Sequence, residues 1–306
     1  MRALANPMPS ARDETAPPIA LLRRMEWRVR HAAEDILSGE YRSAFRGRGM
    51  EFDQVVKYEY GDDVRDIDWN VTARRGEPFR KKYIEERELT IAILFEDSPS
   101  LQFGSAARTK RAALMELASL ISLLCAANRD RLAVLCAGSD HYWFRPPARG
   151  RGPILHSAAS LLAQPPPEDF TGHPAIPWRF VNRAMPRHSI LIWMGDFASA
   201  KEPEGWAALR RRFQIMGFRI DDPWDRTLPE GGVLTVFDPV ENHLIQIDTA
   251  SRAQREAHRQ WVARREASWQ SVFPDPLTRL AALTDEPLLD ALVGFFQRRM
   301  ASAIRH

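Results

Sequence analysis

The chain has few of the features that mark secreted or membrane-spanning proteins. Of its 306 residues only two are cysteines, and neither belongs to a CxxC motif. Cys125 and Cys136 lie in apolar segments, so we expect buried, reduced core residues in a reducing compartment. No segment approaches the ~20 apolar residues of a transmembrane helix, and the N-terminus lacks the apolar core of a signal peptide. We therefore expect a cytoplasmic protein without a membrane span.

The chain also lacks a strong excess of charge of either sign. It has 43 Lys and Arg against 40 Asp and Glu, a formal net charge of +3. This balance gives no reason to expect nucleic acid as a partner. The hydrophobic fraction of 44% is typical of a soluble globular protein, and the length suits one large domain or two modest ones.

Composition divides the chain into four parts. Residues 1–18 are rich in proline, alanine and charge and are expected to form a flexible tail. Residues 19–88 form an N-terminal extension, which begins with a helix over 19–38 and continues as a glycine-punctuated block of short strands and turns. Residues 89–248 are expected to form an α/β domain, and residues 249–306 a C-terminal helical segment.

The third part alternates buried strands with helices. The nearly continuous apolar runs LTIAILF, RLAVLCAG and SILIWMGDF are typical of strands buried on both faces, and QIMGFRI is a fourth. Helical patterns cover residues 108–128, 151–163, 175–185 and 203–213, and residues 231–249 read as a hairpin. This order predicts a doubly wound, mostly parallel sheet with helices on both faces. Such folds bind ligands at the carboxyl ends of their strands.

Polar side chains gather at that expected edge. In LFEDSPSLQFG, Glu96, Ser98 and Ser100 alternate just after the first buried strand. Asp196 ends the third strand, and Thr171 lies in the proline-rich loop between them. Carboxylate and hydroxyl oxygens are ligands that Mg²⁺ accepts, so the five residues form a candidate cation site. The same residue types also make ordinary polar turns, and the spacing alone does not separate the two readings.

The chain resembles a known family over most of its length. Glu96-x-Ser98-x-Ser100 with Thr171 and Asp196 resembles the metal-ion-dependent adhesion site of von Willebrand factor A-like domains. Residues 49–90, GMEFDQVVKYEYGDDVRDIDWNVTARRGEPFRKKYIEERELT, closely resemble the signature of the domain-of-unknown-function 58 family. The segments FGSAARTKRAALMELASL, WMGDF and TDEPLLDALVGFFQRR extend the resemblance to roughly residues 20–300.

The resemblance implies a fold, a cofactor and a partner. It implies a von Willebrand A-like (Rossmann-like) domain and association with a MoxR-type AAA+ ATPase. In such domains a divalent ion, Mg²⁺ or else Mn²⁺ or Ca²⁺, leaves one coordination position open for an acidic side chain of the partner. Here Glu96, Ser98, Ser100, Thr171 and Asp196 would hold that ion.

The chain departs from the family pattern at its first acidic residue. The family has Asp where this chain has Glu96, which adds one methylene, and Pro99 stiffens the same turn. Asp97 could serve instead, although strand alternation should turn its side chain away from Glu96. A metal-bridged site and a site without a tightly held metal therefore both stay open.

The signature block carries a second group of polar residues. Three interpretations of these residues are possible. They could form a second cation site or an acidic docking surface, or they could cap turns and pair with nearby Arg and Lys side chains. We favour the last interpretation. Trp69 is expected to pack rather than to bind a ligand. The residues concerned are Asp62, Asp63, Arg65, Asp66, Asp68 and Trp69.

Several common active sites are not matched. The sequence has no HExxH pair and no Gly-x-Ser-x-Gly elbow, and Thr109 replaces the glycine that a phosphate loop needs before Lys110. The arginines between residues 252 and 265 alternate with Glu256 and are expected to form a solvated face of an amphipathic helix.

We therefore expect a non-enzymatic protein-binding module. It would dock a MoxR-type AAA+ ATPase, or an unidentified client of that ATPase, in chaperone-like maturation or assembly. The alternatives are a structural adaptor with a degenerate, metal-free site and a Mg²⁺-dependent hydrolase that uses the same residues.

Overall fold

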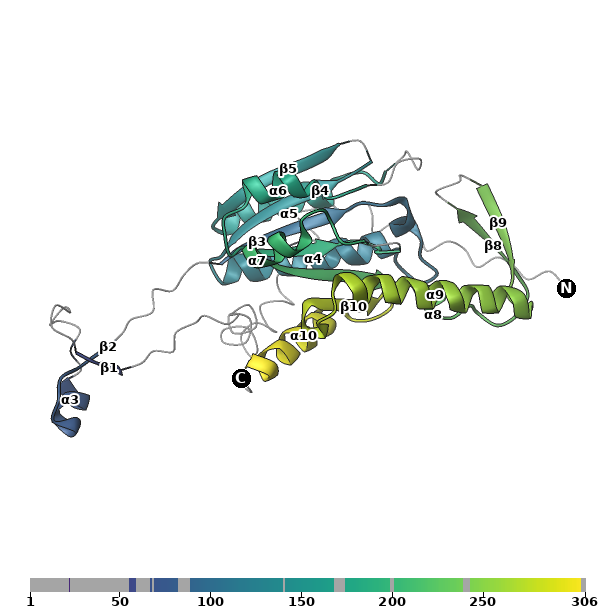
Figure 1. Cartoon of the computed structure of the whole chain (residues 1–306). Helices are drawn as coiled ribbons and strands as arrows, with labels where there is room; N and C mark the ends of the chain where they lie inside the picture. Colours follow the sequence, from purple (N-terminus) through teal and green to yellow (C-terminus); the bar gives the residue numbers. More distant parts are fainter. Residues whose placement is uncertain are drawn as a thin grey trace.

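A six-stranded sheet forms the centre of the molecule, with helices on both of its faces (Figure 1). The strands are β3 (Thr90–Glu96), β4 (Arg131–Ala137), β5 (Tyr142–Arg149), β6 (Ile190–Met194), β7 (Gln214–Asp221) and β10 (Arg279–Leu283). Their order is β10-β7-β6-β3-β4-β5, and every neighbouring pair is parallel except β4 and β5. This structure is a computed structural model and describes residues 22, 55–58, 67, 69–81, 89–139, 141–167, 174–198, 201–238 and 243–303.

The apolar runs become central strands because both faces of the sheet are covered. In β3 the side chains of Ile91, Ile93 and Phe95 enter one core, whereas Ala92 and Leu94 enter the other. The period of two along a strand explains this division. The predicted mostly parallel α/β sheet is therefore confirmed.

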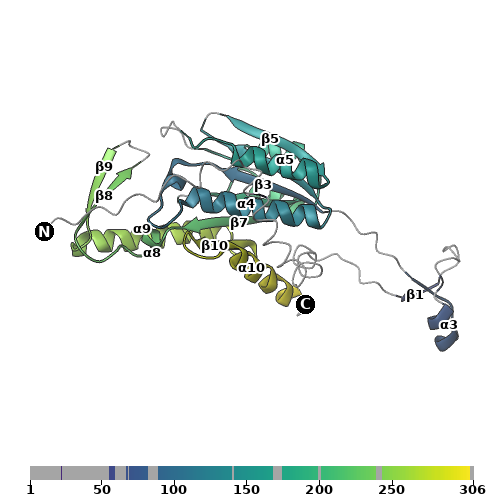
Figure 2. The ribbon, with the colours of Figure 1, turned by 180° about the vertical axis from the view of Figure 1, so that it is seen from behind.

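Each face of the sheet has its own set of helices. One core includes residues of α4 (Lys110–Ala127), α5 (Arg151–Leu162) and α10 (Leu288–Ala303). The other includes residues of α6 (Trp178–Ala184), α7 (Trp206–Arg212) and α9 (Arg252–Val272). Figure 2 shows α4, α5 and α10 from the side opposite to Figure 1.

The strand order reverses beside β3. The chain passes from β3 to β4 and β5 on one side, then returns to β6 on the other side and continues to β7 and β10. The carboxyl ends of β3 and β6 therefore lie side by side, with Phe95 opposite Met194. In open α/β sheets this reversal is where ligands bind, because the connecting loops diverge there.

Two strands and a domain boundary differ from the expectation. β5 was not predicted because it is a half-exposed edge strand with Pro146 and Pro147, rather than an apolar run. β10 has only five residues with partial burial, and it joins the sheet within the segment expected to be helical. Residues 249–306 therefore contribute α9, β10 and α10 to the sheet domain, and the boundary expected at residue 248 is wrong.

The expected hairpin is present outside the main sheet. β8 (Val233–Asp238) pairs antiparallel with β9 (His243–Asp248), and the turn between them lies outside the described residues. The pair forms a sheet of its own and stands at one end of α9 (Figure 1). The short helix α8 (Pro223–Arg226) follows β7.

The described part of the signature block forms a small unit. β1 (Val55–Lys57) pairs with β2 (Phe79–Lys81), and α3 (Trp69–Arg75) lies between them in the chain. A turn follows α3, where Gly76 has φ of 73° and its N–H bonds to the carbonyl of Thr72, in keeping with the expected short strands and turns of this block. Helix α3 was not predicted. The expected tail over 1–18 and nearly all of the helix over 19–38 lie outside the described residues.

Within the described ranges, no helix is both long enough and apolar enough to span a bilayer.

A close contact between β7 and the end of α9 gives a stability prediction. A Cβ on Gly217 would lie 2.7 Å from Cζ of Phe273, whose side chain is fully buried. We expect Gly217→Ala to lower the free energy of unfolding by about 1–3 kcal/mol, because the ring must move in a packed core. Urea denaturation measures this change. Gly152→Ala in α5 is the control, because a Cβ there meets open space; equal losses in both variants would contradict the packing.

Candidate functional site

Four of the five residues proposed for the adhesion-type site meet at one edge of the sheet. Glu96 is the last residue of β3, Ser98 is the N-cap of a 3-10 helix (Pro99–Gln102), and Ser100 lies within that helix. Asp196 lies two residues after β6, and all four line one cleft. Thr171 lies outside the described residues.

The two serine hydroxyls are held close to Asp196. Oγ of Ser98 and Oγ of Ser100 are 2.8 Å apart and share a hydrogen bond. The hydroxyl of Ser100 also donates to the carboxylate of Asp196. Pro99 between them begins the 3-10 helix, where its fixed φ suits the turn.

Two internal cations bind the carboxylate of Asp196. Its Oδ1 accepts from Nζ of Lys110 at 3.1 Å and from Nη2 of Arg265 at 2.7 Å. Arg265 also donates to the backbone carbonyl of Asp196 at 3.0 Å. All three side chains are buried, with at most 5% of each residue exposed. Burial alone would raise the pKa of Asp196, but the charges of Lys110 and Arg265 outweigh it and lower that pKa.

The same cations bind further carboxylates. Lys110 lies 3.1 Å from Oδ2 of Asp225, and Nη1 of Arg265 lies 2.9 Å from Oδ1 of Asp221. Burial tends to lower the pKa of Lys110, yet Asp196 and Asp225 raise it overall. Buried charges persist only when paired in this way. We call Asp196, Lys110, Arg265, Asp221 and Asp225 the buried charge cluster.

Glu96 has a different environment from Asp196. Its Oε2 accepts a 2.8 Å hydrogen bond from Nε1 of Trp193, and the described residues give it no cationic partner. Burial raises the pKa of Glu96 to about 7, with the charge of Asp196 adding to the rise and the Trp193 bond opposing it. Near neutral pH the side chain is therefore partly protonated.

Asp97 belongs to another site. Its Oδ1 and Oδ2 accept from Nε and Nη2 of Arg111 at 2.9 and 2.8 Å, a bidentate ion pair. Its side chain therefore points away from Glu96, as the alternation of the strand predicts.

Among the described residues, the ion pairs of Asp196 oppose a divalent cation in this arrangement. Such an ion needs several oxygen ligands with free lone pairs. Oδ1 of Asp196 is bound by two positive groups, which would repel a dication. Two unit charges about 4 Å apart interact by about 4 kcal/mol near a protein surface. Glu96 is partly protonated near neutral pH, which makes it a weaker ligand than a carboxylate.

Sequence reasoning missed both cations of the buried charge cluster. Lys110 stands inside the segment that imitates a phosphate loop, and Thr109 before it caps α4 by accepting from the N–H of Ala112. The expectation that the arginines of residues 252–265 are all solvated is wrong for Arg265, which is 4% exposed. The sequence does contain an indication that Arg265 is buried. Arg265 precedes the apolar residues Trp269 and Val272 by four and seven positions, and residues at this spacing lie on the same helix face.

A cleft of about 880 Å³ opens beside these residues. Its lining includes Glu96, Ser98, Ser100 and Asp196, aromatic and apolar side chains, and the charged side chains of Arg179, Arg183, Lys201 and Glu204. Trp178 and Trp193 line the cleft and contact each other edge-to-face with ring centroids 5.1 Å apart, and both pack against the buried Trp206 at 5.6 and 6.3 Å. The cleft therefore combines apolar surface with a few hydrogen-bonding groups, as ligand sites generally do.

Of the six residues singled out in the signature block, the structure describes only Trp69. Asp62, Asp63, Arg65, Asp66 and Asp68 lie outside the described residues. Trp69 is 67% exposed, so the prediction that it packs is wrong.

Ionisation of Glu96 predicts how stability depends on pH. Its folded pKa of about 7 lies above the ordinary value of 4.5, so between these values the folded protein holds a proton that the unfolded chain has released. Stability therefore falls as the pH rises through this window, by about 3 kcal/mol at most. Glu96→Gln should remove this fall while still accepting the Trp193 hydrogen bond.

Urea denaturation at pH 4.5 and pH 8, followed by tryptophan fluorescence, measures the effect. Glu96→Gln should gain stability relative to the wild type as the pH rises. Glu202→Gln, which removes an exposed carboxylate, should keep the wild-type profile. Parallel profiles for the wild type and Glu96→Gln would contradict the raised pKa.

Comparison with known proteins gives relatives without an assigned activity. Uncharacterized proteins of Mycobacterium tuberculosis and Mycobacterium bovis are 28% identical over 298 residues, which cover 93% of this chain and 90% of each relative. Among solved structures, an uncharacterized membrane spanning protein from Vibrio fischeri matches 71% of this chain and 98% of its own. That match has 12% identity and a TM-score of 0.23, which is too low to inform the fold.

A family model covers most of the sheet domain and part of the signature block. It matches residues 54–268, from the strand β1 to the last turns of α9. The chain therefore belongs to the family described as "Protein of unknown function DUF58".

Proposed function

We propose that this protein is a non-enzymatic binding module that docks a protein partner in the cleft beside Ser98, Ser100 and Asp196. The resemblance of residues 49–90 to the family signature makes a MoxR-type AAA+ ATPase the first candidate partner, and a client of that ATPase the second. The role would be chaperone-like maturation or assembly of other complexes.

The proposal includes a von Willebrand A-like architecture. Its support is the strand order, with one antiparallel edge strand and a reversal beside β3. The polar residues of the motif lie at that reversal, on the loops after β3 and β6. An adhesion-type site needs this placement, because its ligands come from separate loops that meet at one edge.

The observation that carries the proposal is the cleft itself. It extends from the serine hydroxyls to an aromatic wall that is fixed by packing, so it is formed before a partner arrives. A preformed site loses little conformational entropy on binding. Its mixture of apolar surface and a few polar groups is typical of sites that recognise protein side chains.

We propose that docking needs no resident divalent cation. Lys110 and Arg265 already neutralise Asp196, which in a metal-bridged site would face the ion. The partner would then bind through hydrogen bonds with the Ser98 and Ser100 hydroxyls and through apolar contacts. This corresponds to the alternative in which the metal site is degenerate.

The geometry supports binding over catalysis. Within the described residues, the hydroxyl of Ser98 bonds only to that of Ser100, and neither a histidine nor a carboxylate bonds to it directly. A serine nucleophile needs such a base within hydrogen-bond reach. Asp196 is fixed in two ion pairs with a lowered pKa, so it is a poor proton acceptor at neutral pH.

Filling the cleft tests the proposal. Ala198 is exposed and lines the cleft, so Ala198→Trp should obstruct it without disturbing the core. We expect affinity for a nucleotide-free MoxR-type AAA+ ATPase to fall by roughly tenfold or more, which is about 1.4 kcal/mol. Ala257→Trp, at an exposed position of α9 outside the cleft, is the matched control.

Biolayer interferometry with and without EDTA measures both claims. The wild type and Ala257→Trp should bind equally, and EDTA should change neither. Equal binding by Ala198→Trp would exclude the cleft as the docking site. Loss of wild-type binding in EDTA would show that a metal bridges the partners, since the ATPase carries no Mg²⁺-nucleotide in this assay.

A further inference from the structure

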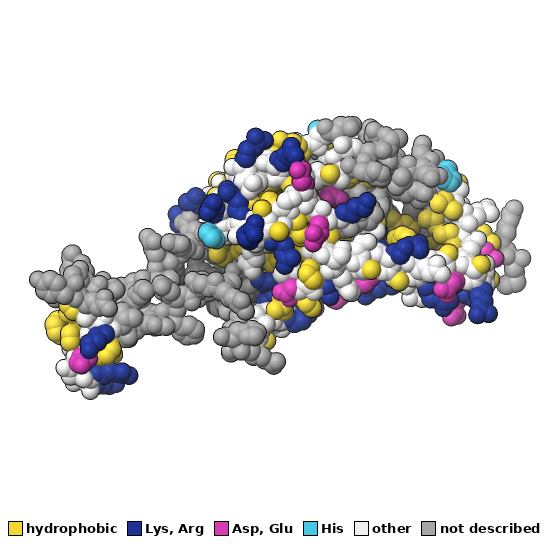
Figure 3. All heavy atoms as spheres, in the orientation of Figure 1, with side chains coloured by type: hydrophobic (Ala, Val, Ile, Leu, Met, Phe, Trp, Pro, Cys, Tyr) yellow, Lys and Arg dark blue, Asp and Glu magenta, His cyan; other side chains and the backbone are white. Residues whose placement is uncertain are grey.

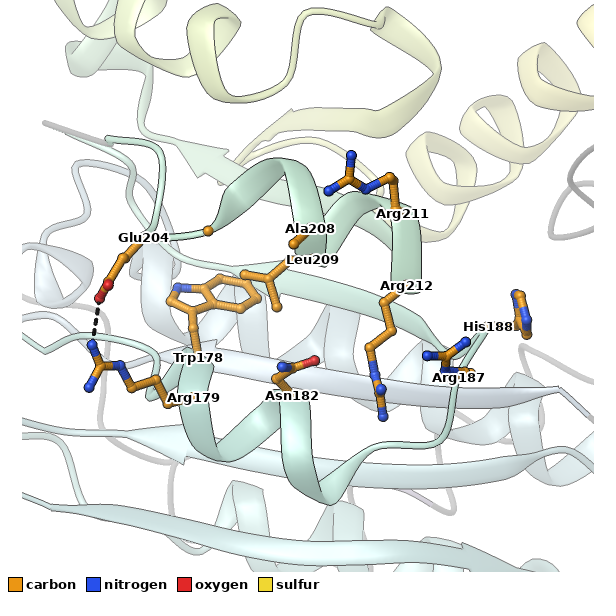
Figure 4. A pocket seen from close by; sticks show the side chains of 11 residues that line it. Trp178, Arg179, Asn182, Arg187, His188, Glu204, Ala208, Leu209, Arg211 and Arg212 are labelled. Carbon is orange, nitrogen blue, oxygen red and sulfur yellow. Dashed lines mark hydrogen bonds and ion pairs between the residues drawn. The ribbon is translucent and has the colours of Figure 1, made fainter.

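A second pocket, of about 390 Å³, lies between α6 and α7 (Figure 4). We propose that it binds an acidic segment of the docked protein partner, through the guanidinium groups of Arg187 and Arg212. The inference deepens the proposed function and rests on it, because the same partner would occupy the cleft and this pocket.

Positive charge dominates the pocket. Four arginines and one glutamate line it. The glutamate, Glu204, pairs with Arg179 at 2.9 Å, which leaves Arg187, Arg211 and Arg212 without a carboxylate among the described residues. Lys and Arg side chains gather over α6 and α7 on the surface of Figure 3. An unneutralised group of this kind attracts and orients an acidic partner.

Hydrogen bonds hold the turn before β6 and the side chain of Arg212, which both line the pocket, in place. The backbone N–H of His188 donates to the carbonyl of Arg212 at 2.9 Å, which fastens the turn before β6 to the end of α7. Arg212 reaches across that turn and donates from Nη2 to the carbonyl of Met185 at 3.2 Å. Its guanidinium carbon also lies 5.2 Å from the ring centroid of Phe213. These contacts hold the Arg212 guanidinium in one position.

Two guanidinium groups therefore face the same space. Figure 4 shows Arg212 extending from α7 toward the end of α6, next to Arg187, whereas Arg211 points the other way. Nε of Arg212 is buried and has no hydrogen-bond partner among the described residues, so no protein acceptor offsets the charge of this guanidinium group there. Guanidinium groups bind carboxylates through paired hydrogen bonds, which are stronger than neutral ones.

The rest of the lining favours a peptide over a small free anion. Trp178 and Leu209 provide apolar surface between the helices, next to the amide of Asn182 (Figure 4). Trp178, Arg179 and Glu204 line both this pocket and the cleft of the proposed docking site. One extended segment can thus continue from the cleft across the Arg179–Glu204 pair and place its carboxylates on Arg187 and Arg212.

Charge reversal tests the pocket without the partner. The probe is a fluorescein-labelled octaglutamate peptide, and its binding is followed by fluorescence anisotropy. Arg187→Glu should weaken binding roughly tenfold or more, because Arg187 is exposed and its loss leaves the fold intact. Arg210→Glu makes the same charge change at an exposed position of α7 outside both pockets and should have little effect. Equal weakening by the two variants would overturn the proposal in favour of general charge attraction.

Two further measurements separate the alternatives. Arg212→Lys keeps the charge but removes the planar fork, so it should also weaken peptide binding. Displacement of the peptide by millimolar inorganic phosphate, with no effect from the same concentration of sulfate, would assign the pocket to free phosphate and overturn the proposal.

The ATPase assay distinguishes failure of this inference from failure of the proposed function. Arg187→Glu should bind the nucleotide-free ATPase more weakly than the wild type does, while Arg210→Glu should not. If the wild type and Arg187→Glu bind the ATPase equally, this inference fails and the proposed docking in the cleft stands. If the wild type does not bind the ATPase, the proposed partner is wrong, whereas the peptide assay still decides whether the pocket binds acidic chains.

Discussion

The ion pairs of Asp196 with Lys110 and Arg265 constrain the whole carboxyl edge of the sheet. They join the loop after β6 to the first turn of α4 on one face and to α9 on the other. Arg265 also binds Asp221 at the end of β7, and Lys110 binds Asp225 in α8. Removing one partner would leave a buried charge uncompensated, which typically costs several kcal/mol. The position of Asp196 after β6 is therefore fixed relative to α4 and α9.

This constraint also decides the chemistry of the site. The positive charge that a bound metal would supply is already present as an ammonium and a guanidinium group within hydrogen-bond distance of Asp196. Glu96, next to it, lacks a cation and is partly protonated near neutral pH. The pKa values of the two neighbouring acids are thus shifted in opposite directions. Asp196 is paired with two cations, which lower its pKa, whereas Glu96 is buried without a cation, which raises its pKa. The edge therefore presents hydroxyl groups, a partly protonated acid and aromatic rings, which is the surface on which the proposed docking rests.

The sequence predicts the fold better than it predicts the site. The central strands are visible as apolar runs because both faces of the sheet are covered, and the reversal beside β3 then brings Ser98 and Asp196 to one edge. β5 and β10 are edge strands whose residues are only partly buried, so their patterns are weak. The cations of the buried charge cluster are harder still, because Lys110 and Arg265 lie 86 and 69 residues from Asp196. Short-range spacing carries no information on such pairs, and an arginine-rich helix normally faces solvent.

The arginine pocket and the cleft adjoin each other, because Trp178, Arg179 and Glu204 line both. The surface of the cleft is largely apolar, whereas that of the pocket is basic.

The central claim is that Lys110 and Arg265 take the place of a metal ion at Asp196, and its most direct test is anomalous diffraction from crystals soaked in Mn²⁺. We predict no anomalous peak near Ser98, Ser100 and Asp196, with Lys110 and Arg265 still bound to the carboxylate. A peak about 2.1 Å from an oxygen of Asp196, with either cation displaced, would contradict the account.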